Sequence, residues 1–212
     1  AAAMPTAYVT ALQALRRHGG IKQGHSVLII GASGGCGTAA IQVAKTLGCG
    51  TLVAVCSGKN AEHCRAHGAD EIIDYTSQSF AGKGNKEKNA SESIRYYDIV
   101  YDCATNSGAG EDYKADSLRV LRPGSVAQGG TNSSVRHGQY VAMNGAIGMW
   151  LRKFTIGQRA NEHLFLTDMN TKDLDELAAM TSLNPVIHME LAFNEDAVAT
   201  GFEVLKSRRT VG

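Results

Sequence analysis

The sequence predicts one α/β domain with a doubly wound parallel sheet of about six strands and helices on both faces. A chain of 212 residues is long enough for one domain with a sizeable core and too short for two. Apolar residues make up 43% and charged residues 19%, a globular composition that excludes a disordered polar chain. Short apolar runs alternate with amphipathic stretches, and this alternation is typical of a parallel sheet.

The charge balance and the cysteines narrow the class of partner. The chain has 21 basic and 20 acidic residues, so its net charge of +1 does not indicate nucleic-acid binding and favours a small-molecule partner. No apolar run reaches the ~18 residues of a membrane span. The five cysteines include no C-x-x-C pair, which argues against a disulfide framework and favours a reducing compartment. The seven histidines show no ligand spacing, so we expect no metal site.

The first elements form one βαβ unit behind an opening helix. Tyr8, Ala11, Leu12 and Leu15 make the apolar stripe of that helix. It is expected to end at the glycine pair 19–20. The apolar run 26–30 predicts a buried parallel strand that leads into the glycine-rich segment 31–37. A helix to residue 48 and a second strand at 51–56 complete the unit.

The rest of the sequence continues the alternation of strands and helices, apart from two segments. Residues 82–95 are expected to be a polar surface insertion without assigned function, and residues 132–148 a loop that either lines the active site or is a mobile connection. The expected elements are a helix around 62–67, strands at 71–75 and 98–101, a helix at 112–121, a fifth strand at 125–128, a candidate sixth at 153–156, a helix carrying Leu174, Leu177 and Ala178, and a last helix striped by Val198, Phe202 and Leu205.

The glycine-rich turn carries the chemistry. Ala32-x-Gly34-x-x-Gly37 follows a strand and opens a helix, the context of a Rossmann dinucleotide fingerprint. Gly34 and Gly35 lack a Cβ, so their N–H groups can approach a pyrophosphate, while Gly37 allows close helix–sheet packing. The expected cofactor-binding residues of this turn are Ala32, Ser33, Gly34, Gly35, Cys36 and Gly37.

Two other nucleotide-binding classes fit less well. Gly31, Gly35 and Gly37 have the spacing of short-chain dehydrogenases, but none of the seven tyrosines has Lys four residues on. A Walker A loop needs Gly-Lys followed by Ser or Thr, whereas Lys59 is followed by Asn60 and Lys83 by Gly84. Triphosphate hydrolysis is therefore not expected.

Cys36 allows two interpretations. A thiol at a helix N-terminus has a lowered pKa and is sensitive to oxidation. Packing beneath the cofactor phosphates is the favoured alternative.

The end of the second strand indicates the cofactor. Enzymes that prefer NAD place an acid there for the ribose 2′-OH, but the segment after residue 54 reads Val-Cys-Ser-Gly-Lys. Ser57 can donate to a 2′-phosphate and Lys59 can neutralise it, which favours NADPH; the alternative is that they form a solvated turn. Cys103, Ala104 and Gly129, at later strand ends, are further candidates for the cofactor crevice.

Several segments together resemble a known family. They are the Ala-rich opening 1–5, the turn 31–37, Gly-Ala-Asp-Glu-Ile-Ile-Asp-Tyr at 68–75, Tyr-Asp-Ile-Val-Tyr-Asp at 97–102 and Leu-Arg-Pro-Gly at 121–124. In order and spacing the chain resembles the cofactor-binding domain of medium-chain dehydrogenases/reductases, in the zinc-independent quinone oxidoreductase branch. It departs from that pattern at Cys36, where Val is usual, in the polar insertion near 85 and in lacking the N-terminal substrate domain.

The resemblance implies a set of expectations. Residues 1–212 would be the dinucleotide-binding domain of a longer two-domain reductase that transfers hydride from NADPH to a quinone or an activated carbonyl or enone. Tyr75 would complete the 2′-phosphate pocket, and the domain alone would be inactive. A homodimer would pair through the outermost strand, near Phe154–Ile156, and the location would be cytoplasmic or mitochondrial. A catalytically inactive nucleotide-sensing or scaffold protein with a Rossmann core is the alternative.

Overall fold

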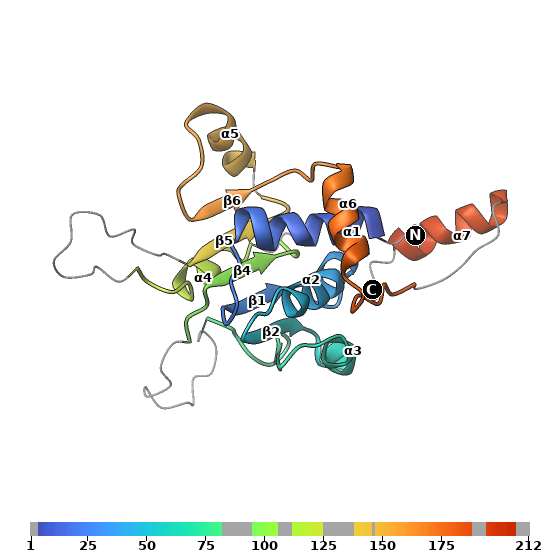
Figure 1. The fold of residues 1–212 in the computed structure, drawn as a ribbon, viewed down its shortest axis with the longest axis horizontal. Helices are drawn as coiled ribbons and strands as arrows, with labels where there is room; N and C mark the ends of the chain where they lie inside the picture. Colours follow the sequence, from blue (N-terminus) through green and yellow to red (C-terminus); the bar gives the residue numbers. More distant parts are fainter. Residues whose placement is uncertain are drawn as a thin grey trace.

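The fold confirms the predicted Rossmann class. The computed structural model describes residues 4–81, 95–105, 112–124, 138–145, 147–187 and 194–206. Its strands form one six-stranded parallel sheet in the order β3-β2-β1-β4-β5-β6 (Figure 1). They are β1 (Ser26–Ile30), β2 (Thr51–Cys56), β3 (Glu71–Asp74), β4 (Ile99–Asp102), β5 (Gln139–Ala142) and β6 (Glu162–Leu164).

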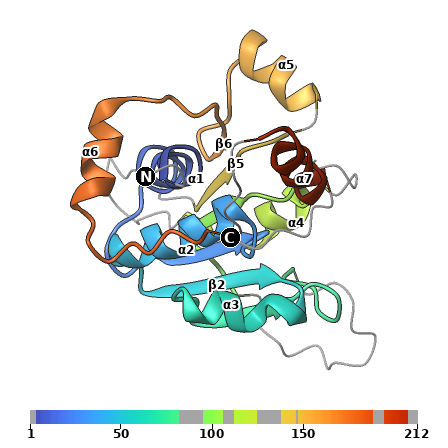
Figure 2. The ribbon, with the colours of Figure 1, turned by 90° about the vertical axis from the view of Figure 1, so that its right-hand side faces the viewer.

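Helices cover both faces of this sheet, as predicted. The first helix continues from α1 into one π-helical segment, η1, and the chain turns at Gly20, whose φ is 58°. Figures 1 and 2 both show α6 beside α1. The helices are α1 (Met4–Leu12), η1 (Gln13–His18), α2 (Gly35–Thr46), the 3-10 turn η2 (Gly58–Asn60), α3 (Ala61–Ala66), α4 (Lys114–Arg119), α5 (Ile147–Thr155), α6 (Thr171–Ala179) and α7 (Glu195–Lys206).

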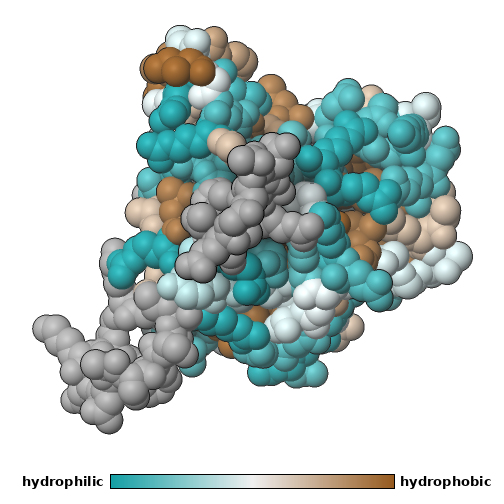
Figure 3. Space-filling model, turned by 60° about the vertical axis from the view of Figure 1, so that its left-hand side comes forward, coloured by the Kyte–Doolittle hydropathy of each residue, from teal (hydrophilic) through white to brown (hydrophobic). Residues whose placement is uncertain are grey.

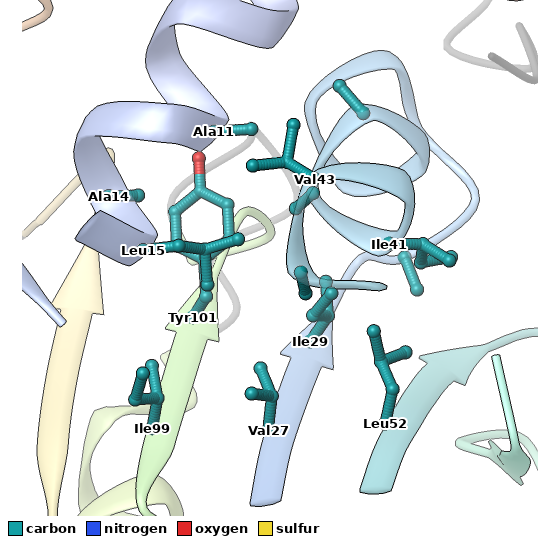
Figure 4. Close-up of a cluster of buried hydrophobic side chains, with 14 of the residues drawn as sticks. Ala11, Ala14, Leu15, Val27, Ile29, Ile41, Val43, Leu52, Ile99 and Tyr101 are labelled. Atoms are coloured by element: carbon teal, nitrogen blue, oxygen red, sulfur yellow. The ribbon is translucent and has the colours of Figure 1, made fainter. Parts of the chain in front are cut away.

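Alternate residues of each strand point to opposite faces and create two buried clusters. On one face, Val27 and Ile29 of β1 and Tyr101 of β4 pack under α1 and α2 (Figure 4). On the other, Leu28 and Ile30 join residues of β2, β4, β5 and β6, with partly buried side chains from α4 and α5 packed on them. Because β1 is buried on both faces, its uninterrupted apolar run is explained.

An interhelix ion-pair network joins the opening helix to α6. Asp173, almost completely buried, accepts hydrogen bonds from Gln13 Nε2 at 2.6 Å and from Arg17 at 2.7 and 2.8 Å. These contacts lower the pKa of Asp173, although burial alone would raise it. Helix α6 is thereby fixed to the N-terminal helix.

One strand prediction and part of one loop prediction were wrong in the second half of the sheet. Residues 153–156, predicted as the sixth strand, belong to the end of α5 and the turn after it, where the rings of Trp150 and Phe154, one helical turn apart, stack with centroids 6.0 Å apart. The edge strand is instead β6. Part of the predicted loop 132–148 is the strand β5, whose last three residues are buried although glycine and polar residues surround them in sequence.

Some predictions lie outside the described residues, namely the strand at 125–128 and most of the insertion at 82–95.

None of the described helices is long and apolar enough to cross a membrane.

Candidate dinucleotide-binding site

The glycine-rich turn lies at the carboxyl end of β1, where the strand order reverses between β1 and β4. Open α/β sheets bind ligands at such switch points. Gly31 adopts a left-handed φ of 76°, which favours glycine. The N–H groups of Gly31 and Ala32 both donate to the carbonyl oxygen of Val55 at 3.1 Å, so the end of β2 holds the turn in place.

The start of α2 has the features of an anion-binding helix terminus. Gly34 is the N-cap residue, and no side chain caps this end. The first N–H groups of a helix lack intrahelical acceptors, and the helix dipole favours an anion there. This terminus fits a dinucleotide pyrophosphate.

Gly37 permits the close packing that the sequence predicted. A Cβ on Gly37 would lie 2.3 Å from the carbonyl oxygen of Gly31 and 2.6 Å from Cα of Ala32. Both are backbone atoms of the turn, so any side chain at 37 would displace it.

The predicted 2′-phosphate residues lie beside this turn. Ser57 is half-buried and Lys59 is exposed in the turn that follows β2. Asn60 closes it and donates from Nδ2 to Ser33 Oγ at 3.0 Å, which connects it to the glycine-rich turn. Tyr75 is 55% exposed and its N–H donates to the carbonyl oxygen of Cys56 at 3.2 Å. The structure therefore brings Ser57, Lys59 and Tyr75 to one edge.

Asp74 is an acid that the sequence argument did not place here. It ends β3, opposite Cys56 in the register, and it accepts a hydrogen bond from the N–H of Gly58. Hydrogen bonds from the hydroxyl and N–H of Thr76, together with that of Gly58, lower the pKa of Asp74. The sequence feature that could have identified Asp74 was its position at the end of a predicted strand.

The end of β4 forms the other side of the crevice. Ala104 lies close to the glycine-rich turn, since a Cβ on Gly31 would be 3.1 Å from its Cβ. The buried Asp102 fixes this segment by accepting from the N–H groups of Ala104 and Thr105, each at 2.9 Å, and from Tyr140 Oη at 2.9 Å. Burial, followed by the charge of Asp102, raises the pKa of Tyr140. Sequence analysis missed these positioning residues, and its candidate Gly129 lies outside the described residues.

The two thiols near the crevice are not activated. Burial raises the pKa of the Cys36 thiol, and burial also raises that of Cys103, with the neighbouring Cys36 as a smaller cause. The interpretation of Cys36 as a thiol with a lowered pKa is therefore wrong, because burial of the side chain disfavours the thiolate. Cys103 packs against the hydrophobic core on the α1 and α2 face of the sheet.

The comparisons with known proteins agree with this geometry. The family model described as zinc-binding dehydrogenase matches residues 67–212. Among the described residues, no three His, Cys, Asp or Glu side chains lie together in a way that would hold a metal ion, so they do not fit a zinc centre.

Curated relatives and solved structures give the same assignment. The mouse protein "NAD(P)H oxidoreductase RTN4IP1, mitochondrial" is 31% identical over 92% of this chain and 50% of its own length. The tomato (Solanum lycopersicum) 2-methylene-furan-3-one reductase is 28% identical over 100% of this chain and 45% of its own length. The quinone oxidoreductase of Coxiella burnetii, 26% identical, superposes over 100% of this chain and 58% of its own with a TM-score of 0.70.

The chain thus spans about half the length of the curated relatives that it matches. The family model, by contrast, covers more than half of this chain. The protein therefore belongs to the zinc-binding dehydrogenase family of medium-chain dehydrogenases/reductases.

Proposed function

We propose that this chain is the NADPH-binding domain of a reductase that transfers hydride to a quinone or an activated carbonyl or enone. The observation that carries the proposal is the turn at residues 57–60, which presents a hydroxyl and an ammonium group beside a glycine-rich pyrophosphate cradle. The name of the mouse protein supports a nicotinamide cofactor, and the names of the tomato and Coxiella proteins support a furanone or a quinone as the acceptor.

The cofactor preference follows from the groups at the end of β2. A 2′-phosphate carries about two negative charges at neutral pH and gains from hydrogen-bond donors and a cation. Ser57 supplies a hydroxyl and Lys59 an ammonium group, and β2 itself ends without an acid. Asp74 is the nearby carboxylate, and its oxygens are engaged by Gly58 and Thr76.

In the reaction, NADPH supplies the hydride, and the chain supplies its position. The start of α2 would hold the pyrophosphate, and the segment from Cys103 to Thr105, fixed by Asp102, would line the crevice beside it. The described residues of this crevice include no general acid of the Tyr-Lys type. The acceptor is held by a second domain, which supplies the opposite wall of the cleft.

The proposal is tested by following NADPH oxidation in the full-length protein and in residues 1–212 alone. We expect the full-length protein to reduce a simple benzoquinone or an α,β-unsaturated ketone, and the fragment to turn over neither at a useful rate. Near-attack positioning of the acceptor lowers the barrier by up to roughly 7 to 11 kcal/mol, and it requires both walls. Equal rates from the two proteins would refute the two-domain arrangement. NADPH binding without oxidation by any acceptor would favour a nucleotide sensor.

We also propose that the protein forms a homodimer through the edge of its sheet, now assigned to β6 instead of residues 154–156. The adjacent α5 exposes Ile147, Leu151 and Phe154, which are 79%, 61% and 73% accessible. Figure 3 shows hydrophobic residues at the upper end of the molecule, where α5 lies in Figure 1. Open edges and apolar patches of this kind are commonly covered by a partner. Light scattering of the full-length protein should give twice the monomer mass, and a monomer at all concentrations would contradict the proposal.

An intracellular location, cytoplasmic or mitochondrial, is a further part of the proposal. The mitochondrial name of the mouse relative and the five free cysteines support it. Imaging of the tagged full-length protein would test it, and secretion would contradict it.

A further inference from the structure

The turn from Ser57 to Asn60 is short and half-exposed, yet it is held from two sides. Within the turn, the N–H of Asn60 donates to the carbonyl oxygen of Ser57 at 2.9 Å. Gly58 and Lys59 are exposed, so the turn has little apolar packing of its own. Beyond its attachment to β2, its position relative to the pyrophosphate cradle depends on polar contacts with its neighbours.

The first contact comes from β3. Asp74 pairs in register with Cys56, the last residue of β2, and accepts from the N–H of Gly58. A Cβ on Gly58 would lie 2.5 Å from Asp74 Oδ2, so the carboxylate packs directly against the turn. Thr76 completes the arrangement by donating to Asp74 Oδ1 from its N–H at 3.0 Å and its hydroxyl at 2.7 Å.

The second contact comes from the glycine-rich turn. Asn60 donates to Ser33 Oγ at 3.0 Å, across a separation of 27 residues. A neighbouring hydrogen bond, between His63 Nε2 and Thr38 Oγ1 at 3.0 Å, joins α3 to the first turn of α2 in the same way. The turn after β2 and the pyrophosphate cradle are therefore connected by side chains as well as by the sheet.

We propose that Asp74 and Asn60 are positioning residues that hold this turn in the geometry that recognises the adenosine 2′-phosphate. The inference rests on the proposed NADPH preference and adds the residues that set it. When the turn is already ordered, binding carries no free-energy cost for ordering it. Only a ligand that contacts Ser57 and Lys59 binds more tightly for this reason. The ribose 2′-OH of NADH is uncharged and forms no ion pair with Lys59, so the affinity of the protein for NADH depends little on the turn.

The experiment measures the dissociation constants of NADPH and NADH for full-length variants by titration. Asp74→Ala and Asn60→Ala should each weaken NADPH binding by about fivefold, the effect of one lost hydrogen bond, and leave NADH within about twofold. Asp74→Asn should keep NADPH affinity at or above the wild-type value, because its amide oxygen still accepts from Gly58 and a negative charge near the phosphate is removed. Gln78→Ala, an exposed neutral change in the same segment, is the matched control.

The direction in which Asp74→Ala changes NADPH affinity distinguishes positioning from repulsion. Stronger NADPH binding in that variant would show that the carboxylate acts by repulsion, and equal losses for both cofactors would show general support of the fold; either result overturns the inference. A wild-type protein without NADPH preference would overturn the proposed function and this inference together. Wild-type preference with unaffected Asp74→Ala and Asn60→Ala variants would overturn the inference alone.

Discussion

Gly37→Ala is expected to lower the melting temperature by about 6 to 12 °C and to abolish dinucleotide binding. The new Cβ would lie 2.3 Å from the Gly31 carbonyl oxygen and 2.7 Å from the carbonyl carbon of Ala32, and neither backbone atom can move without distorting the turn. Overpacking typically costs about 1 to 3 kcal/mol, and we expect the upper end here because both contacts are with backbone atoms. Each kcal/mol lowers the melting temperature of a domain of this size by about 2 to 4 °C. Calorimetry and NADPH titration measure the two effects.

Gly148→Ala is the matched control for that substitution. Gly148 lies within α5, and a Cβ there meets nothing within 4 Å. Alanine favours a helix over glycine by about 1 kcal/mol, so this variant should be as stable as the wild type or slightly more so. Normal melting and normal cofactor affinity in Gly37→Ala would refute the close approach of α2 to the turn.

Lys59→Ala is expected to weaken NADPH binding by about tenfold while changing NADH affinity by less than twofold. A charge-assisted contact with a phosphate contributes more than a neutral hydrogen bond, and the exposure of Lys59 limits the gain through solvent screening. The loss should shrink as salt is raised, since screening weakens the wild-type contact. Titrations at two ionic strengths measure both effects.

The control for Lys59 is Lys172→Ala, which removes an exposed lysine from α6. It makes the same change in net charge away from the turn after β2. Similar losses of NADPH affinity in both variants would mean that overall charge, and not a contact at the turn, sets the affinity.

The sequence predicted the elements whose signals are local. The strands at 26–30 and 51–56 and the helix between them were confirmed, because hydrophobic periodicity and glycine spacing suffice to define a βαβ unit. The segment 153–156 misled because its β-branched and aromatic residues favour a strand, whereas the stacking of Trp150 on Phe154 favours a helix. In β5 the short apolar run was hidden among polar neighbours.

Sequence analysis proposed the candidate site residues that lie within one segment, and it missed those that depend on contacts between distant segments. The glycine-rich turn lies within one short segment, and Ser57 and Lys59 lie within another, so the residue types in each segment indicated its chemistry. Asp74 contributes to the site because the parallel register of β2 and β3 places it beside Gly58. Asp102 contributes because it accepts hydrogen bonds from Thr105 and Tyr140. Such contacts depend on strand order and register, which single-sequence patterns do not define.

The most direct test of the central claim is a comparison of NADPH and NADH binding to the wild-type full-length protein under one set of conditions. The turn with Ser57 and Lys59, held beside the pyrophosphate cradle, predicts that NADPH binds at least about tenfold more tightly, the equivalent of roughly 1.4 kcal/mol. Equal affinities, or tighter binding of NADH, would contradict the account.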